Sequence, residues 1–223
     1  MKIIDQLVCP VCLFCSSPIF PEENLCEGDF TIICENCLDR LGWPDPLTKF
    51  SDERVRLADK VIYIWEYDKV KDVIHKLKFG GDFRVRYLVA NLIKDFVVDN
   101  QELFKSSEMV SFVPMHWFKF LFFRPIDLAR WTANLLSQVL SLDVAPLFTV
   151  SFFKPTLHRL KDGRDRRLAI KNVFDFSQTI PSNVKGILLV DDILTTGSTF
   201  SELCWMIRRI RPGVKITVFS LCG

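Results

Sequence analysis

Two common nucleotide-binding loops are missing from this chain of 223 residues. It contains neither G-x-x-x-x-G-K-[ST] nor G-x-G-x-x-G, which excludes the P-loop and dinucleotide-binding classes of phosphate site. No internal repeat or low-complexity tract occurs, so a repeat architecture is excluded as well. A phosphate-binding function in this chain would need a different kind of loop.

Long apolar runs are also absent. The most hydrophobic segment, Trp117–Phe123, is short and is interrupted by Lys119, so we expect no membrane insertion. Residues Met1–Asp5 begin no apolar run of signal-peptide length, so we expect a cytoplasmic protein. Cysteines stay reduced in that compartment, and clustered cysteines there indicate a metal site before disulfides.

Charge is nearly balanced, at +2, but it is unevenly distributed. Residues 1–59 carry five Lys/Arg and eleven Asp/Glu, whereas residues 60–223 carry 24 and 16. The basic part is where a polyphosphate or a nucleic acid would be attracted. The length and the 49% of apolar residues suffice for one α/β domain with a small appendage.

Six of the eight cysteines lie in the first 37 residues. Two C-x-x-C pairs, separated by 18 residues, have the spacing of a four-thiolate zinc site: Cys12 with Cys15, and Cys34 with Cys37. Cys9 forms another C-x-x-C with Cys12, but this register would lengthen the spacer to 21 residues, so we favour the first set. Buried reduced cysteines without metal are the alternative.

A module this small has too little apolar area to fold alone, and zinc would supply the missing stability. Four protein ligands leave no open coordination position, so the site would be structural or used for docking. The residues that follow, up to about Asp59, are polar and charged and are interpreted as a linker. We therefore divide the chain into a zinc module with linker (1–59) and an α/β domain (60–223).

Strands and helices alternate in the predicted pattern of the second part. Apolar periodicity and stop signals predict, in order, a strand at Val61–Trp65, a helix over Val70–Leu77, a helix from roughly Arg84 to Val98, a strand at Met109–Pro114, a helix begun by Asp127, and a final strand at Val214–Leu221. Strand, loop and helix in this order build a parallel sheet. The expected fold class is therefore α/β with a small zinc-binding module in front.

Residues 187–199 read I-L-L-V-D-D-I-L-T-T-G-S-T. Four apolar residues predict a buried strand that ends at Asp191 and Asp192, and a loop around Gly197 follows. Thr199 and Glu202 have the spacing of a capping box, which predicts a helix that begins with Thr199 as its N-cap.

Each part of this unit has a chemical use. The free N–H groups of a helix start favour a phosphate, and Gly197 lets the backbone approach it. Hydroxyl donors are added by Thr195, Thr196, Ser198 and Thr199. Carboxylates beside a phosphate need another partner, and the hydroxyls of a phosphorylated ribose would suit Asp191 and Asp192. The alternative is a polar turn after a buried strand.

This spelling resembles the phosphoribosyl-pyrophosphate (PRPP) motif of type I phosphoribosyltransferases. The resemblance implies that Asp191 and Asp192 are catalytic and bind PRPP together with residues 195–199, with Mg²⁺ on the pyrophosphate. It also implies that the loop after the first core strand, which contains His116 and Arg124, holds the pyrophosphate. Lys78, at the end of a predicted helix, could also meet a phosphate; a solvated helix end and an ordinary surface histidine are the alternatives.

The most basic stretch is Lys154–Lys171. Its inner cations are Arg159, Lys161, Arg164, Arg166 and Arg167. They are typical of a mobile loop that closes over an anion, of a contact to the backbone of single-stranded nucleic acid, or of a solvated charged surface. The sequence leaves these three interpretations open.

The whole chain resembles the ComF family of bacterial competence proteins. The resemblance rests on the two cysteine pairs, on Leu41-Gly42-Trp43, on Leu77-Lys78-Phe79-Gly80-Gly81-Asp82, on Val113-Pro114-Met115-His116 and on the PRPP motif. It implies a cytoplasmic role in natural transformation, in which imported single-stranded DNA is handled with helicase or recombination partners. Many members have R-G-F-N-Q where this chain has Arg124-Pro125-Ile126-Asp127-Leu128, which favours sugar-phosphate binding over efficient transfer.

Two functions follow from these expectations. In the first, the pocket binds PRPP or a related phosphorylated ribose and the protein serves competence. In the second, it is a genuine phosphoribosyltransferase that transfers ribose 5-phosphate to a base or an amine and releases pyrophosphate, by positioning and charge stabilisation.

Overall fold

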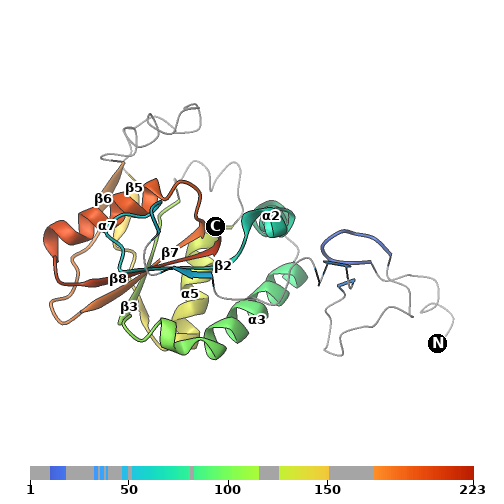
Figure 1. Ribbon diagram of the computed structural model, residues 1–223, viewed down its shortest axis with the longest axis horizontal. Coiled ribbons are helices and arrows are strands. Elements are labelled where there is room, and N and C mark those ends of the chain that lie inside the picture. Colours follow the sequence, from blue (N-terminus) through green and yellow to red (C-terminus); the bar gives the residue numbers. More distant parts are fainter. Residues whose placement is uncertain are drawn as a thin grey trace.

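The computed structural model of the chain describes residues 11–18, 33–34, 36–37, 39, 47–49, 52–80, 83–115, 126–150 and 173–223. Its centre is a six-stranded sheet in the order β1-β2-β8-β7-β3-β4 (Figure 1). The strands in that order are β1 (Leu47–Lys49), β2 (Lys60–Trp65), β8 (Lys215–Cys222), β7 (Gly186–Ile193), β3 (Met109–Phe112) and β4 (Asp143–Val144). All neighbours from β2 to β4 pair in parallel, and only β1 is antiparallel to its neighbour. The five parallel strands confirm the predicted α/β class.

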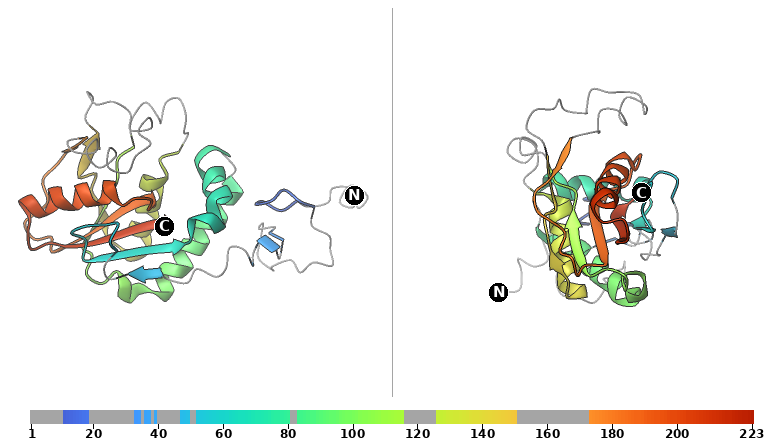
Figure 2. Two further views of the ribbon diagram at one scale, coloured as in Figure 1. Left: turned by 45° about the horizontal axis from the view of Figure 1, so that its top comes forward. Right: turned by 90° about the vertical axis from the view of Figure 1, so that its left-hand side faces the viewer.

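Helices cover both faces of this sheet, as Figure 2 shows. One face packs against α2 (Tyr67–His75), the π-helical turn η1 (Lys76–Gly80), α3 (Phe83–Asp99) and α5 (Leu128–Leu140), and the other against α7 (Ser198–Ile210). A short 3₁₀ turn, η2 (Gln101–Leu103), follows α3, and a separate antiparallel pair joins β5 (Phe148–Val150) to β6 (Phe174–Phe176). None of the helices in the described parts of the chain is long and apolar enough to cross a membrane.

Strand β7 shows why its sequence is a continuous apolar run. Leu188 and Val190 are buried in the core that contains α3 and α5, whereas Ile187 and Leu189 are buried in the core that contains α7. Successive side chains of a strand point to opposite faces, so a strand covered on both sides needs apolar residues at every position. The prediction of a buried strand before the acid pair is therefore confirmed.

Two predictions about the ends of this unit are wrong in detail. Asp191 and Asp192 do not end the strand, because β7 continues to Ile193. Helix α7 begins at Ser198 and has Gly197 as its N-cap, in the left-handed region at φ 67°, so Thr199 does not cap it. The left-handed turn at Gly197 starts the helix before the predicted capping box.

The stretch interpreted as a linker packs on the α/β domain. β1 pairs with β2 in antiparallel register, and Val55 is buried in the core under α7. Asp59 receives hydrogen bonds from the backbone of Ile216 and from the guanidinium of Arg208. These residues belong structurally with the sheet, while the division of the whole chain at residue 59 stays a prediction.

Candidate functional site

The acid pair lies at the carboxyl edge of the parallel sheet. Asp191 and Asp192 are near the end of β7, which runs between β8 and β3. The backbone N–H of Asp192 donates to Oδ1 of Asp191 at 2.8 Å, and the N–H of Leu194 donates to the carbonyl of Cys222 at 2.8 Å. In open α/β sheets, ligands bind outside the carboxyl ends of the strands. The acid pair is thus held by strand pairing at the edge where a ligand site is expected.

Burial and mutual repulsion disfavour simultaneous ionisation of the two carboxyl groups. Burial at the strand end raises the pKa of Asp191 well above its usual range, and the charge of Asp192 raises it further. The N–H of Asp192 and the ammonium of Lys78 act in the opposite direction. Burial and a like charge both penalise the ionised form of an acid. The site therefore favours partners that bring positive charge or hydrogen-bond donors.

The chain itself supplies one such partner. Nζ of Lys78 lies 2.5 Å from Oδ2 of Asp192, and both side chains are largely withdrawn from solvent. Lys78 belongs to η1, which follows α2, and α2 follows the carboxyl end of β2 at the same edge of the sheet. The structure thus joins Lys78 to the acid pair, and its contact with a pyrophosphate stays a prediction.

The loop after the acids leads directly into α7. Thr195 and Thr196 are exposed, and the hydroxyls of Thr196 and Ser198 lie 2.9 Å apart. Within the described residues, no side chain caps the start of α7. The first N–H groups of a helix lack partners inside the helix and carry its positive end. The acids, the hydroxyls and this helix start therefore occupy one continuous segment, as the sequence predicted.

A segment that the sequence analysis missed holds this loop in place; we call residues 52–56 the strap. A Cβ atom at position 197 would lie 2.0 Å from the carbonyl oxygen of Arg54, so only glycine fits there. The guanidinium of Arg54 donates to the carbonyl of Leu194 at 3.3 Å and pairs with Asp52 at 2.9 Å. The contact of the strap with the loop could not be predicted from local sequence, because the two segments lie far apart along the chain. Gly197 was the only local signal of a close backbone approach.

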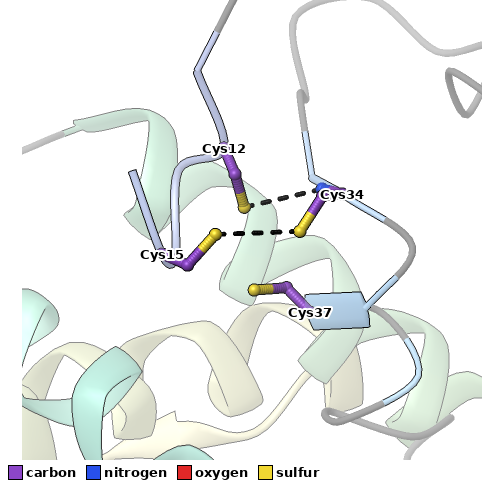
Figure 3. Close-up of side chains that lie close together, drawn as sticks. All are labelled: Cys12, Cys15, Cys34 and Cys37. Carbon is purple, nitrogen blue, oxygen red and sulfur yellow. Dashed lines mark hydrogen bonds between the residues drawn. The ribbon is translucent and has the colours of Figure 1, made fainter. Parts of the chain in front are cut away.

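The four predicted zinc ligands come together in the N-terminal region (Figure 3). The sulfur atoms of Cys12, Cys15, Cys34 and Cys37 all lie within 4.8 Å of one another, and those of Cys15 and Cys34 are 3.7 Å apart. Zn–S bonds of about 2.3 Å at a tetrahedral angle place two sulfurs about 3.8 Å apart. The donor set therefore fits zinc and could bind it. Cys9 lies outside the described residues, so the alternative register is not tested.

The four thiols differ in their hydrogen bonds and in the effect of burial on their pKa values. Sγ of Cys12 accepts from the backbone N–H groups of Phe14, at 3.4 Å, and of Cys34, at 3.5 Å. Hydrogen bonds from the side chain and backbone of Ser17 lower the pKa of Cys15 to about 6. Burial, as the largest cause, raises the pKa of Cys34 and of Cys37. Thiolates are the metal ligands, so the charge of a metal would be needed to deprotonate the buried thiols.

The other predicted site residues lie outside the described parts of the chain. These are His116 and Arg124 of the loop after β3, and Arg159, Lys161, Arg164, Arg166 and Arg167 of the basic stretch. Their roles at a pyrophosphate or a nucleic acid stay predictions.

Comparison with known proteins identifies a relative of this chain. No protein-family model matches the chain. Competence protein F of Haemophilus influenzae is 30% identical, over an alignment that covers 68% of this chain and 68% of the relative. The chain therefore belongs to the competence protein F family, as the resemblance of its motifs predicted.

Proposed function

We propose that this protein is a ComF-type competence protein whose α/β domain binds a phosphorylated ribose, with PRPP as the leading candidate. One observation carries the proposal: the acid pair, the hydroxyl-rich loop and the uncapped start of α7 follow one another at the carboxyl edge of β7. A helix start suits a phosphate, and the paired carboxylates suit the hydroxyls of the sugar. Mg²⁺ would arrive with the pyrophosphate, and carboxylate oxygens are the protein ligands that it prefers.

Each group in the site would have a separate task. Asp191 and Asp192 would accept hydrogen bonds from the ribose hydroxyls, directly or through water. The N–H groups of the first turn of α7 and the hydroxyls of residues 195–199 would hold the 5′-phosphate. Lys78 offsets the charge of Asp192, which reduces the repulsion between the acid pair and an anionic ligand.

The biological role rests on the family. A relative that is named for competence supports a role in natural transformation, where this protein would work on imported single-stranded DNA in the cytoplasm. The basic residues between Lys154 and Lys171 would contact the DNA backbone, and the zinc module would dock helicase or recombination proteins. Reduced cysteines are expected in that compartment, which suits a zinc site.

Calorimetry tests the binding function. Zinc-loaded protein is titrated with PRPP and Mg²⁺, with ribose 5-phosphate and with pyrophosphate. We expect binding of PRPP, and we expect that Asp191→Asn combined with Asp192→Asn abolishes it. Asp143→Asn is the matched control, because Asp143 is exposed on β4 of the same sheet and pairs with the first residue of β3, far from the carboxyl edge. If folded wild-type protein gives no heat with any phosphorylated pentose, the proposed site is wrong.

Turnover and DNA binding are then measured on the same protein. Pyrophosphate release that depends on an added base or amine would make the protein a genuine phosphoribosyltransferase, the second function that the sequence left open. Binding of single-stranded DNA that weakens steeply with salt, and that is lost when the basic residues at 159–167 are replaced, would support the competence function without transfer.

A further inference from the structure

One short turn touches both the cysteine cluster and the acid pair. The π-helical turn η1 carries Lys76 and Lys78, and Leu77 between them is 1% exposed. Residues two apart on such a turn point in nearly opposite directions, about 160° apart. Lys76 faces the cysteine cluster and Lys78 faces Asp192, so η1 connects two sites that are distant in sequence.

Lys76 binds the loop inside the first cysteine pair. Its Nζ donates to the carbonyl of Leu13 at 2.8 Å and to that of Phe14 at 2.6 Å. These are the two residues between Cys12 and Cys15. The side chains of Leu13 and Phe14 are buried in the same core as Leu77, so the loop and the turn are also packed together. The conformation of this C-x-x-C loop therefore fixes the acceptors of Lys76.

A metal would control that conformation. Four thiolates on one ion close the C-x-x-C loop, and without the ion the loop is held only by hydrogen bonds and packing. The turn η1 has five residues, and π-helical turns are rare overall but frequent at functional sites. A change at Lys76 can therefore reach Lys78 through only two peptide units.

We propose that metal binding at the cysteine cluster positions Lys78 on Asp192 through Lys76, and so sets the affinity of the acid pair for its ligand. Lys76 acts as a positioning residue: it touches no ligand, and it holds the turn that carries Lys78. When Lys78 is displaced, the acid pair loses the positive charge of its ammonium and repels an anionic ligand more strongly. The affinity part of this inference rests on the proposed binding of a phosphorylated ribose; the positional part does not.

Coupling of this kind works in both directions. If zinc raises the affinity for PRPP, then PRPP must raise the affinity for zinc by the same factor. Couplings between protein sites are typically about 5- to 150-fold, and we expect about tenfold here. Zinc affinity, measured by competition with a chromophoric chelator, is therefore a readout that requires no turnover.

The first experiment needs no ligand. Hydrogen exchange is measured on zinc-loaded wild-type protein, on Lys76→Met and on the conservative variant Lys76→Arg, which keeps a donor for the two carbonyls. We expect faster exchange of residues 76–80 and 191–194 in Lys76→Met at unchanged zinc content, and near wild-type exchange in Lys76→Arg. Lys71→Met on α2 is the control, because Lys71 is exposed on the preceding helix. Unchanged exchange in Lys76→Met would overturn the proposal, and so would equal changes in the control.

The second experiment uses PRPP and Mg²⁺ with Lys76→Met, Lys78→Met and the double variant. We expect about a tenfold loss of affinity for Lys76→Met, and no further loss when it is added to Lys78→Met, because residues that act through one another are not additive. Additive losses would show that Lys76 acts independently of Lys78 and would overturn the positioning role. If wild-type protein binds no phosphorylated pentose while the exchange results hold, the proposed function fails and the link between the two sites stands.

Discussion

The cysteine cluster and the acid pair both gather side chains that become negative when they ionise, but they solve this problem differently. At the acid pair, the ammonium of Lys78 lies 2.5 Å from Asp192, and paired strands fix the backbone on either side. At the cysteine cluster, the hydrogen bonds that the described residues donate to Cys12 and Cys15 come from neutral groups, namely backbone N–H groups for Cys12 and Ser17 for Cys15. The first site has the ammonium of Lys78 against it, whereas a bound metal would supply the positive charge at the second.

This difference shows what holds each site together: the sheet at the acid pair, and a metal, once bound, at the cysteine cluster. The acid pair sits on a strand whose residues 187–190 are fully buried, so the sheet forms it without help from a ligand. The cysteine cluster joins two short stretches of chain, one around Cys12 and Cys15 and one around Cys34 and Cys37, whose four sulfur atoms lie within 4.8 Å of one another. A bound metal would therefore be a structural requirement in one region, and a ligand would be an addition in the other.

The largest effect should come from removing the metal ligands. We expect Cys34→Ser, or treatment with a strong chelator, to unfold the N-terminal region while the sheet stays folded. Zinc sites of this kind contribute about 10–16 kcal/mol of apparent binding free energy at neutral pH, which far exceeds what so few buried residues can replace. Limited proteolysis followed by mass spectrometry should locate new cleavage within residues 11–39.

Asn36→Ala provides the control for this prediction, because Asn36 is exposed between Cys34 and Cys37. It should keep both the zinc content and the protease resistance of the wild type. Cleavage that spreads through the sheet in Cys34→Ser would show that the two regions are not separable, and the contrast between them would disappear.

The next largest effect should come from Gly197→Ala, which tests whether the acid-pair region is held by the protein alone. Alanine would adopt a left-handed conformation and place its Cβ 2.0 Å from the carbonyl of Arg54. We expect a loss of about 2–4 kcal/mol in the free energy of unfolding, from backbone strain and from displacement of the strap. Urea denaturation measures it. Gly213→Ala is the matched control: a Cβ there meets nothing within 4 Å, so its effect should be small.

The local sequence predicted the cysteine pairs and the strand before the acid pair, but it did not predict the contact between Gly197 and Arg54. The strand before Asp191 was readable because four apolar residues in a row suit a strand buried on both faces. The cysteine pairs were readable because ligand spacing is local. Gly197 was recognised as a place of close approach, but to a phosphate; the carbonyl of Arg54 that lies against it comes from a different part of the chain.

The contacts of Lys76 and Lys78 were also beyond prediction from the local sequence, because their partners lie far away along the chain. The helix before Gly80 could be predicted from Val70, Val73 and Ile74, which are buried as expected. Its continuation as a π-helical turn, and the partners that Lys76 and Lys78 contact, depend on what packs around the turn. Residues 52–59 were interpreted as a linker because they are mostly polar and charged. Val55, their one deeply buried apolar side chain, gives no periodic pattern by itself.

A smaller effect, but one with a clear sign, should come from Asp191→Asn. The pKa of Asp191 is raised in the folded protein, so the folded state holds this proton more tightly than an unfolded chain does. The resulting stabilisation is complete at low pH, below the unfolded pKa, and is lost as the pH rises through the folded pKa. The variant lacks this loss, so its Tm should rise relative to wild type as the pH is raised from about 4, the ordinary pKa of an aspartate, into the neutral range.

Thermal unfolding across that range measures the difference, with Asp143→Asn as a control that should show no comparable trend. The same Asp191→Asn substitution should weaken PRPP binding. Greater stability together with weaker binding is the combination that an acid pair kept for a ligand predicts, and a parallel loss of both would argue that Asp191 serves only the fold.

The smallest effect should come from Arg54→Lys, which keeps the charge of the strap and removes its planar fork. The guanidinium donates both to Asp52 and to the carbonyl of Leu194, and a lysine ammonium cannot keep both contacts in that geometry. Because this side chain is about one-third exposed, we expect a loss of only about 1 kcal/mol in the free energy of unfolding. The loop after the acids should loosen nonetheless, so faster hydrogen exchange at residues 194–197 should accompany a few-fold loss in PRPP affinity. Lys105→Met, which breaks an exposed pair with Glu102, should change neither quantity. If Arg54→Lys also matches wild type in both, the strap is only a neighbour of the loop, and the acid-pair region owes its preformed geometry to the sheet alone.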